Sequence, residues 1–387
     1  MLKVTTVAYF DNAATTFPKP ECVYSFADEF YRTVGGNAGR GIYAQAVASN
    51  RLIDETRNLL AELFHCGTKQ VIFLPSATFA LNVIIQGIIL RGAKNVYVSP
   101  FEHNAVTRTL HRFAERGLIT VTELTVTDAL EFDMHGIRRQ FENLRPNFLI
   151  VSHASNVIGL IAPVEKICAL AKTFGATTLV DMAQTAGLVD LNVGLETIDF
   201  AVFAGHKTLF APTGTGGFVM NPAVELEPIL FGGTGFDSAN QNLPDTLPER
   251  FEVGTLNISG LAGLNAALKW IAGQTTAKLF RDEQIARRRL LKLLSEYEFL
   301  KIVGNVDGRD YVGIVSCVMT GVDSVTAGEL FSARGIAVRA GLHCAPFAHK
   351  FLGTLPAGTI RFSVNCMTTD EDFAELQSAL DDIGDEI

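Results

Sequence analysis

The sequence has no run of basic residues, and its 41 acidic residues outnumber its 32 basic ones, which gives a net charge of −9. Such a chain lacks the cationic surface with which proteins bind nucleic acid or anionic membranes. Long hydrophobic runs are missing too. The longest, near residues 81–90, is interrupted by Gln86 and Gly87 and is too short to cross a bilayer. Because Met1–Thr6 contain no hydrophobic signal region either, we expect a cytoplasmic protein without nucleic-acid or membrane partners.

Cysteines are few and scattered. The six cysteines form no CxxC pair, so the sequence indicates neither a disulfide framework nor a zinc ribbon. Cys168 and Cys317 lie within apolar patterns that are typical of a protein core. Cys344 differs, because it lies in a loop beside His343. A zinc site made of His343, Cys344 and His349 matches no common ligand spacing, so we expect no metal.

Strand-like and helix-like segments alternate along the chain, without internal repeats or low-complexity tails. With 387 residues, of which 48% are hydrophobic, the chain can bury a large core and form two domains. Helical spacing of apolar residues predicts helices over residues 51–64 and 79–90. Short apolar runs predict the intervening strands, at residues 71–74, 95–99, 147–152, 177–180 and 200–203. The pattern favours an α/β fold with a parallel sheet, followed by a smaller C-terminal α+β domain.

Lys207 follows the apolar run at residues 200–203 directly, within the sequence Ala204-Gly205-His206-Lys207. A lysine at the mouth of a buried strand is costly unless its amine is used, because burial favours the uncharged form. An uncharged amine attacks aldehydes, so Lys207 is a candidate Schiff-base lysine of the kind that holds pyridoxal 5'-phosphate (PLP). The alternative for an isolated lysine is a side chain that extends from the strand end to solvent.

Polar residues also follow two neighbouring strands. Residues 177–180 end in Asp181, and residues 147–152 run into His153 and Asn156. Open parallel sheets bind ligands at the carboxyl ends of their strands. A carboxylate at Asp181 can hold the protonated pyridine nitrogen of PLP, so Asp181 and Lys207 would face one ring.

Two helix starts carry further candidate groups. Backbone N–H groups at the start of the helix after Pro75-Ser76-Ala77-Thr78 can hold a phosphate with help from the Thr78 hydroxyl. The alternative at this position is an ordinary Ser or Thr cap. His103, at the next helix start, can stack on a planar cofactor or remain solvated. The region from about residue 231 to 248 is rich in Gly, Asn, Asp and Pro, which is typical of a long functional loop.

The predicted C-terminal domain holds a second group of candidate residues. Cys344 lies close to Arg339, and positive neighbours raise the thiolate fraction of a thiol. Arg361 lies within a predicted strand at residues 359–363, where its guanidinium can bind a substrate carboxylate at two points. The alternative for Arg361 is a surface salt bridge.

These residues lie in motifs that together resemble one family. They are Tyr9-Phe10-Asp11-Asn12-Ala13-Ala14-Thr15-Thr16, Phe101-Glu102-His103-Asn104, His153-Ala154-Ser155-Asn156, Asp181-Met182-Ala183-Gln184, Gly205-His206-Lys207, Phe251-Glu252-Val253-Gly254-Thr255 and Arg339-Ala340-Gly341-Leu342-His343-Cys344. Their order resembles that of the cysteine desulfurase and selenocysteine lyase branch of the class V aminotransferases. The resemblance spans about Tyr9 to Ser363.

The resemblance implies a fold and a domain division. The fold would be that of the fold type I PLP-dependent transferases, with a mostly parallel seven-stranded sheet between helices and a small C-terminal α+β domain. The large PLP-binding domain would cover residues 15–260. The small domain would cover residues 261–387, carry the catalytic cysteine loop and associate with the N-terminal segment 1–14.

The resemblance also implies a role for each candidate. The catalytic residues would be Lys207, Cys344 and His103. Lys207 would bind PLP and move the substrate Cα proton, and Cys344 would attack the substrate sulfur, leaving alanine and an enzyme persulfide. Arg361 would bind the substrate carboxylate, beside Asn156 and Arg339. The remaining candidates would hold the cofactor: Asp181 at the pyridine nitrogen, His103 on the ring, Gln184 and Asn156 beside the phenolic oxygen, and Ala77, Thr78, His206 and, from a second subunit of a homodimer, Thr255 at the phosphate.

Departures from the family pattern keep alternatives open. Ala204 and Ala77 stand where relatives commonly have hydroxyl residues at the phosphate, and Thr208 is a candidate replacement. The resemblance predicts a desulfurase that acts on L-cysteine, with selenocysteine as a second candidate substrate, and that passes sulfur to an acceptor protein. One alternative is another class V PLP reaction, such as transamination or racemisation, which gives Cys344 no task. The other is a non-enzymatic sulfur carrier or redox sensor, which gives Lys207 no task.

Overall fold

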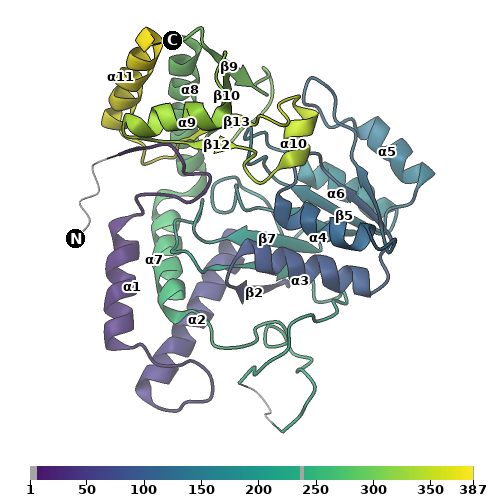
Figure 1. The fold of residues 1–387 in the computed structure, drawn as a ribbon. Helices are drawn as coiled ribbons and strands as arrows, with labels where there is room; N and C mark the ends of the chain where they lie inside the picture. The colour runs from purple at the N-terminus through teal and green to yellow at the C-terminus, as the bar shows by residue number, and fades with distance from the viewer. Residues whose placement is uncertain (1–6, 236–238, 387) are drawn as a thin grey trace.

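The computed structural model describes residues 7–235 and 239–386. They form two layered units, each built around its own sheet (Figure 1). The larger sheet is enclosed by helices on both faces, and the smaller sheet lies beside α8, α9 and α11. The first described strand, Ala8–Tyr9, and the last helix, Asp370–Glu386, both lie on the side of the smaller sheet.

The large sheet has the strand order β2-β8-β7-β6-β5-β3-β4. Strand β8 is antiparallel to both of its neighbours, and the other neighbouring strands are parallel to each other. This mostly parallel seven-stranded sheet confirms the predicted fold class. Its strands are Gln70–Leu74 (β2), Asn95–Val98 (β3), Thr120–Glu123 (β4), Phe148–Ser152 (β5), Thr177–Asp181 (β6), Phe200–Ala204 (β7) and Gly216–Met220 (β8).

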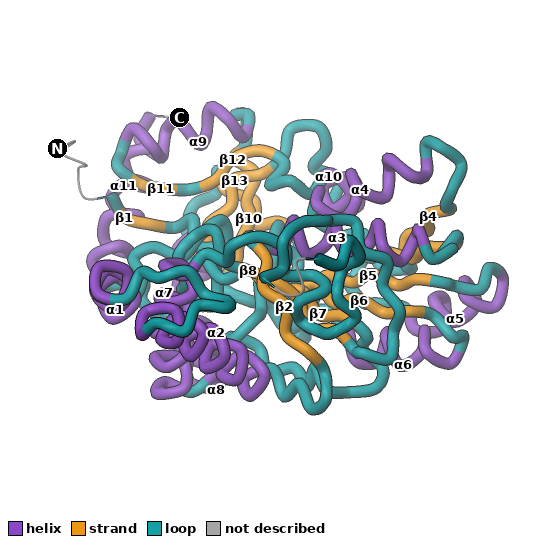
Figure 2. Tube along the Cα trace, turned by 90° about the horizontal axis from the view of Figure 1, so that it is seen from below, coloured by secondary structure: helices purple, strands orange, loops and turns teal. Residues whose placement is uncertain are grey.

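The central strands β5, β6 and β7 are buried along almost their whole length because helices cover both faces of the sheet (Figure 2). Successive residues of β5 enter different cores. Phe148 and Ile150 belong to the cluster that includes α3 and α4, whereas Leu149 and Val151 belong to the cluster on the opposite face. The period-2 geometry of a strand thus divides a continuous apolar run between two cores.

Eleven helices are assigned within residues 7–235 and 239–386. The predicted helix over 51–64 begins earlier, at Ala44, and the one predicted from residue 79 begins at Ala77. Their bounds are Glu21–Thr33 (α1), Ala44–Leu63 (α2), Ala77–Leu90 (α3), Asn104–Ala114 (α4), Met134–Asn143 (α5), Val164–Thr173 (α6), Ile258–Gln274 (α7), Thr276–Ser295 (α8), Ser324–Ala333 (α9), Pro346–Phe351 (α10) and Asp370–Glu386 (α11). None of these helices is long and apolar enough to cross a membrane.

The smaller sheet is antiparallel, with the order β12-β13-β10-β9. The N-terminal strand β1 (Ala8–Tyr9) pairs with β11 (Ile336–Ala337), so the start of the chain joins the C-terminal unit. The boundary predicted at residue 260 falls inside α7 and stays a prediction. The other strands are Leu300–Val303 (β9), Ile314–Met319 (β10), Arg339–Gly341 (β12) and Thr359–Ser363 (β13).

The predicted long loop connects β8 to α7, and the described residues 221–235 and 239–257 contain no helix or strand. Its end is fixed to the large sheet by Glu252, which forms a two-point ion pair with Arg57 at 2.8 and 3.0 Å. The same carboxylate accepts a hydrogen bond of 2.7 Å from the backbone N–H of Phe73. Glu252 therefore holds the loop end, and with it the nearby Thr255, against β2.

We expect Glu252→Ala to destabilise the protein by about 3 kcal/mol, because it leaves a largely buried arginine without its carboxylate partner. The measurement is the urea midpoint of unfolding. Glu196→Ala, which removes an exposed carboxylate without an ion pair in the described chain, should shift stability by less than about 0.5 kcal/mol. Equal midpoints for the two variants would contradict the anchoring role.

Candidate functional site

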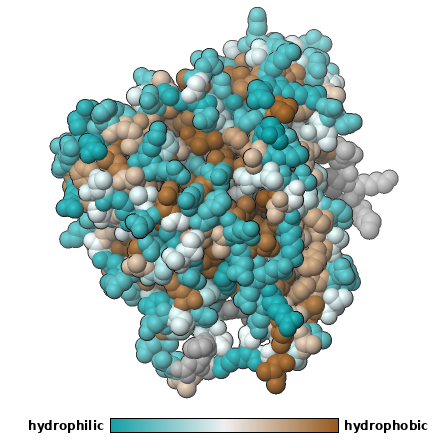
Figure 3. Space-filling view, turned by 180° about the vertical axis from the view of Figure 1, so that it is seen from behind, coloured by the Kyte–Doolittle hydropathy of each residue, from teal (hydrophilic) through white to brown (hydrophobic). Residues whose placement is uncertain are grey.

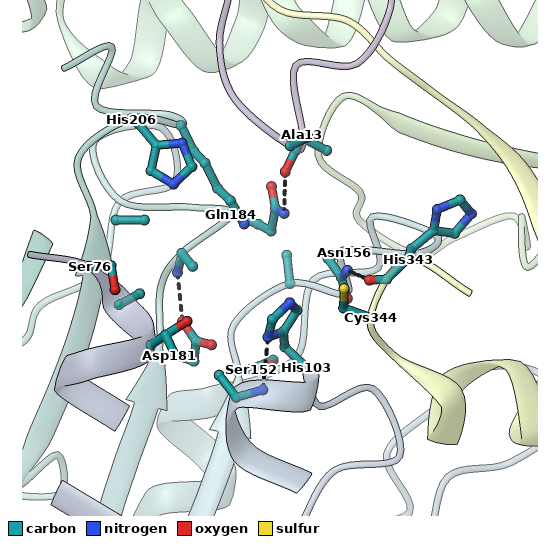
Figure 4. A pocket seen from close by; sticks show the side chains of 18 of the residues that line it. Ala13, Ser76, His103, Ser152, Asn156, Asp181, Gln184, His206, His343 and Cys344 are labelled. Atoms are coloured by element: carbon teal, nitrogen blue, oxygen red, sulfur yellow. Dashed lines mark hydrogen bonds between the residues drawn. The ribbon is translucent and has the colours of Figure 1, made fainter. Parts of the chain in front are cut away.

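The carboxyl ends of β5, β6 and β7 open into a cavity of about 240 Å³ (Figure 4). Helix starts of the large unit and the loop after β12 complete its wall. Apart from Thr255 and Thr208, the residues proposed from the sequence to bind cofactor or substrate all line this cavity: Ala77, Thr78, His103, Asn156, Asp181, Gln184, His206, Lys207, Arg339, Cys344 and Arg361. The topology thus brings together groups that are separated by up to 284 positions in the chain (Ala77 to Arg361).

Lys207 lies just beyond the end of β7. Burial lowers the pKa of its amine to about 8, and the nearby Asp181 carboxylate opposes that shift. Arg361 and Arg339 lower the Lys207 pKa further, whereas Cys344 raises it. Near neutral pH a substantial fraction of the amine is therefore uncharged and nucleophilic.

Asp181 is the last residue of β6, and its side chain is buried. Burial raises the pKa of this carboxyl, whereas a hydrogen bond from Ala183 N (2.9 Å) and the charge of Lys207 lower it. Because few contacts stabilise its charged form, the buried Asp181 carboxylate is a good partner for a cationic ring nitrogen.

The start of α3 forms one end of the cavity. Ser76 caps the helix by accepting a hydrogen bond of 3.3 Å from Phe79 N, which leaves the N–H groups of Ala77 and Thr78 at the open, positive end of the helix. A Cβ on Gly216 would lie 2.9 Å from the Ser76 Cα, so β8 reaches this turn because residue 216 is glycine. The arrangement suits an anion.

The expectation that Thr208 supplies a replacement hydroxyl at this end of the cavity is wrong. Thr208 does not line the cavity; its hydroxyl donates to Ala186 O at 2.7 Å and it borders a neighbouring small cavity. The hydroxyl residues at the start of α3 are Ser76 and Thr78. The sequence Pro75-Ser76-Ala77-Thr78 indicated a cap, but it did not show that Ser76 also borders the site.

His103 caps α4, where its Nδ1 accepts a hydrogen bond of 3.0 Å from Ala105 N. Burial lowers the pKa of His103 to about 4, and the charges of Lys207, Arg108 and Arg339 add to the shift. The ring is therefore neutral at pH 7, and because Nδ1 is an acceptor, its proton is on Nε2. In this conformation His103 can donate a hydrogen bond but cannot act as a base through Nε2.

Arg361 is a buried member of the site, not a surface ion pair, since its side chain is 2% exposed. Its Nη2 donates to Asp11 Oδ1 at 2.8 Å, and its Nη1 donates to Asn156 O at 2.9 Å. Arg339 approaches the other Asp11 oxygen at 3.7 Å. One carboxylate therefore stands between two arginines, so the pair retains net positive charge for an anionic ligand.

Two amide side chains already have backbone partners. Gln184 donates from Nε2 to Ala13 O at 3.0 Å, and Asn156 donates from Nδ2 to His343 O at 2.6 Å. Both contacts cross between distant chain segments and fix the cavity wall. The Asn156 contact also holds the residue that precedes Cys344 (Figure 4).

Cys344 is exposed and lies in the left-handed backbone region, with φ 57°, as does His343 with φ 48°. Two consecutive non-glycine residues in this region store strain that surrounding contacts must offset. Asn104 N donates to Cys344 O at 2.7 Å, and the buried His343 ring shares a 2.9 Å hydrogen bond with Thr359 Oγ1. The loop is thus fixed to both units, with the Cys344 side chain at the cavity wall.

No cluster of three or more His, Cys, Asp or Glu residues with metal-binding geometry occurs in residues 7–235 and 239–386. His343 and His349 are neighbours, with ring centroids 5.5 Å apart. Nε2 of His343 is hydrogen-bonded to the Thr359 hydroxyl, and Nδ1 of His349 is hydrogen-bonded to the Thr354 hydroxyl.

Thr255 lies outside the cavity that contains Lys207. It borders a separate cavity of about 500 Å³, together with Asn37, Gly39, Arg57 and Gly235. Within one chain, Thr255 therefore does not join the other candidate residues.

Four buried polar atoms of residues that line the Lys207 cavity have no hydrogen-bond partner among the residues that the structure describes. They are His206 Nδ1, Asn156 Oδ1, His343 Nδ1 and Arg361 Nε. Unpaired buried polar atoms are costly, and clusters of them mark places where a ligand completes the hydrogen bonding. With a nucleophilic amine, a buried carboxylate and a helix start in the same cavity, the residues fit a flat, cationic ring that carries an anionic group.

Asp11 and His343 lie within the family motifs, but the sequence indicates no role for them in the proposed reaction. Asp11 precedes its partner Arg361 by 350 positions, and nothing in its local sequence indicates that pairing. Glu102 was also missed: its buried carboxylate accepts hydrogen bonds from Ser99 Oγ (2.5 Å) and Ser152 N (2.7 Å), tying the ends of β3 and β5 together beneath His103.

Comparison with known proteins agrees with this geometry. The chain is 29% identical over 381 residues to a probable cysteine desulfurase of Methanothermobacter thermautotrophicus, covering 97% of this chain and 94% of that protein. Its fold matches the apo structure of a cysteine desulfurase from Thermococcus onnurineus NA1 with a TM-score of 0.89 and 27% identity, covering 98% and 95% of the two chains. The cysteine desulfurase CsdA from Escherichia coli, solved in an S-sulfonic acid form, matches with a TM-score of 0.84 and 25% identity over 99% and 96% of the chains. The aminotransferase class-V family model matches residues 8–376, and the chain therefore belongs to the class-V aminotransferase family, in which its relatives include cysteine desulfurases.

Proposed function

We propose that the protein is a PLP-dependent cysteine desulfurase, which converts L-cysteine to L-alanine and leaves the sulfur as a persulfide on Cys344. The observation that carries the proposal is that Lys207 and Cys344 line the same cavity. The first supplies an amine of lowered pKa, and the second supplies an exposed thiol within a rigidly held loop.

The residues of the cavity divide into those suited to each part of PLP. Lys207 is the amine that would hold its aldehyde carbon, and Asp181 the carboxylate that would pair with its ring nitrogen. The start of α3 at Ala77 and Thr78, with His206, would hold its phosphate. When bound, PLP would supply an electron sink that weakens the bonds at the substrate Cα and then the Cβ–S bond.

The substrate carboxylate is proposed to bind Arg361. Its guanidinium uses one N–H toward Asp11 and one toward Asn156, and its Nε–H has no partner in the described chain. Fixed by those two contacts, the guanidinium is oriented before a ligand arrives, which reduces the entropy cost of binding.

Proton transfer at Cα is assigned to Lys207 and not to His103. When it is not engaged by the cofactor, the Lys207 amine would be free to take the proton, and its pKa of about 8 suits base work near neutral pH. His103 keeps Nδ1 bonded to Ala105 N and carries its proton on Nε2, so it can orient or stabilise charge on the ring.

Cys344 would complete the reaction as the nucleophile. Its Sγ attacks the substrate sulfur, an S–S bond forms and the Cβ–S bond breaks. The electron pair of the broken bond stays with carbon, which takes a proton to become the methyl group of alanine. The contacts of His343 and Asn104 hold the loop so that this attack needs little rearrangement.

The two alternatives make different use of the cavity. A transaminase or racemase needs Lys207 and leaves the strained, exposed Cys344 without a task. A sulfur carrier or redox sensor needs Cys344 and does not explain the buried pair of Lys207 and Asp181.

A second copy of the chain is proposed to complete the site. Thr255 lies outside the Lys207 cavity of its own chain, so its implied contact with the phosphate requires a partner subunit. Hydrophobic atoms reach the surface at the lower end of the molecule in Figure 3. Large apolar side chains are strongly exposed in the chain, among them Ile42 at 95% and Phe231 at 74%, which suits burial in a homodimer.

The pKa of Lys207 gives a pH prediction. The protonated amine cannot attack an aldehyde, so the rate of PLP capture by cofactor-free protein should rise with pH up to about 8 and then level off. The measurement is the absorbance change of PLP on mixing, between pH 6 and pH 10. A rate that continues to rise towards pH 10 would show that the amine has an ordinary lysine pKa.

The central test is Cys344→Ala. We expect the variant to bind PLP and L-cysteine, because Lys207, Asp181 and Arg361 are unchanged, but to lose desulfurase turnover by a factor of roughly 100 or more. Alanine and sulfide are assayed together, with L-cysteine and a reductant.

The matched control is Cys22→Ala, which removes the other exposed cysteine, on α1, and should leave turnover unchanged. Full activity of folded Cys344→Ala would contradict the proposed reaction. Alanine or pyruvate formed by the wild-type protein without sulfide or persulfide would favour a different class V reaction.

A further inference from the structure

Cys344 is exposed to solvent and is at the same time part of the wall of the catalytic cavity. A sulfur atom placed on it can therefore be reached from outside while the loop stays where it is. The loop has little freedom to move, since Asn104 N binds Cys344 O and Asn156 Nδ2 binds His343 O. Whatever removes the sulfur must approach the surface that surrounds Cys344.

The surface around Cys344 is basic, although the protein as a whole has a net charge of −9. Arg339 lines the same cavity, and its side chain is 45% exposed. Arg108 is exposed on α4, one turn beyond the residue whose N–H binds Cys344 O. Both arginines lie close enough to His103, another residue of the cavity wall, for their charges to lower its pKa.

A third cation comes from α10, which begins two residues after Cys344. Lys350 is exposed on this helix, and its neighbour Phe351 packs against Phe101 with ring centroids 5.4 Å apart. The helix is thereby held beside the turn that leads to His103. Arg108 and Lys350 have no ion pair with any residue in the described ranges 7–235 and 239–386.

We propose that Arg108, Arg339 and Lys350 form a cationic rim around Cys344 that selects an anionic sulfur acceptor, a thiol flanked by carboxylates. The inference rests on the proposed function for the presence of sulfur on Cys344. Asp11 neutralises only part of the charge, because it is shared between Arg339 and the buried Arg361. Unpaired cations at an opening raise the local concentration of anionic reactants and speed their association.

The transfer itself balances without another reactant. The acceptor thiolate attacks the outer sulfur of the Cys344 persulfide, a new S–S bond forms, and the bond between that sulfur and Cys344 Sγ breaks. The electron pair of the broken bond leaves on Sγ, which becomes the Cys344 thiolate again. The acceptor departs as a persulfide.

The charge of the rim is tested without any turnover, by alkylating the purified protein with iodoacetate and iodoacetamide. The two reagents are similar in size and attack the same thiolate, so their rate ratio reports the local potential and cancels the thiolate fraction. At low salt we expect the iodoacetate-to-iodoacetamide ratio at Cys344 to exceed the ratio at the exposed Cys22 by about threefold to tenfold, and 0.5 M salt should largely remove the difference.

Charge removal from the rim should reduce that ratio. Arg108→Gln and Lys350→Gln are each expected to lower it at Cys344, whereas Arg288→Gln should not. Arg288 is an exposed arginine on α8, which lies away from α4 and α10 in Figures 1 and 2. A Cys344 ratio equal to that of Cys22, or unchanged by both rim variants, would overturn the cationic rim.

Acceptor selection is tested with two small thiols, mercaptosuccinate and the neutral 2-mercaptoethanol. We expect mercaptosuccinate to give the higher steady-state alanine rate relative to its reactivity with a free persulfide, and Arg108→Gln to reduce that preference at least about twofold. The alanine formed in the first turnover precedes the transfer, so it should be the same in Arg108→Gln and wild type. No first-turnover alanine in the wild type would refute the desulfurase proposal, whereas normal first-turnover alanine without a preference for mercaptosuccinate would refute the anionic acceptor.

Discussion

The buried ion pair between Asp11 and Arg361 is the contact on which the cavity depends. It joins the N-terminal segment to β13, and the same guanidinium reaches Asn156 O at the end of the large sheet. An arginine that is 2% exposed would be strongly destabilising without such partners. One side chain therefore connects three separate parts of the chain, and it does so at the point where a substrate carboxylate is proposed to bind.

Charged and polar groups elsewhere in the cavity also have few stabilising partners. Asp181 is buried and Lys207 is partly buried, and each only partly stabilises the charged form of the other, so the pKa of the lysine falls and that of the carboxyl rises. Polar atoms on His206, Asn156 and Arg361 have no partner in the described chain. A polar ligand that pairs with these atoms would stabilise the folded protein by mass action, as expected of a preformed cofactor site.

The Cys344 loop shows how strain is maintained in a functional segment. Two adjacent residues adopt left-handed backbone angles, and contacts from α4, Asn156 and Thr359 hold them there. The contacts use the backbone of the loop and the ring of His343, so the Cys344 side chain remains available at the cavity wall. The exposed thiol is therefore compatible with both sulfur uptake from inside the cavity and sulfur release to the outside.

Much of the fold could be predicted because apolar runs and strand ends are local features. The strands before Asp181 and Lys207 follow from such runs, and the parallel sheet then explains why their ends meet. Helix starts were less predictable: Ala77 begins α3 because Ser76, not Thr78, provides the cap. The pairing of Asp11 with Arg361 could not be predicted, because the two residues lie 350 positions apart and nothing in the local sequence of either one indicates the other.

The same limit applied to Asn156, whose amide group binds His343 O across 187 positions of sequence. The chemical roles of the cavity residues stay predictions, whereas the positions that bring them together are those of the structure.

The central claim is that one cavity removes sulfur from L-cysteine with Lys207 and delivers it to Cys344. The most direct test treats the wild-type protein with one equivalent of L-cysteine and then alkylates and maps its peptides by mass. The account predicts one added sulfur atom on the Cys344 peptide together with one equivalent of alanine, and alanine with the added sulfur on another residue would contradict it.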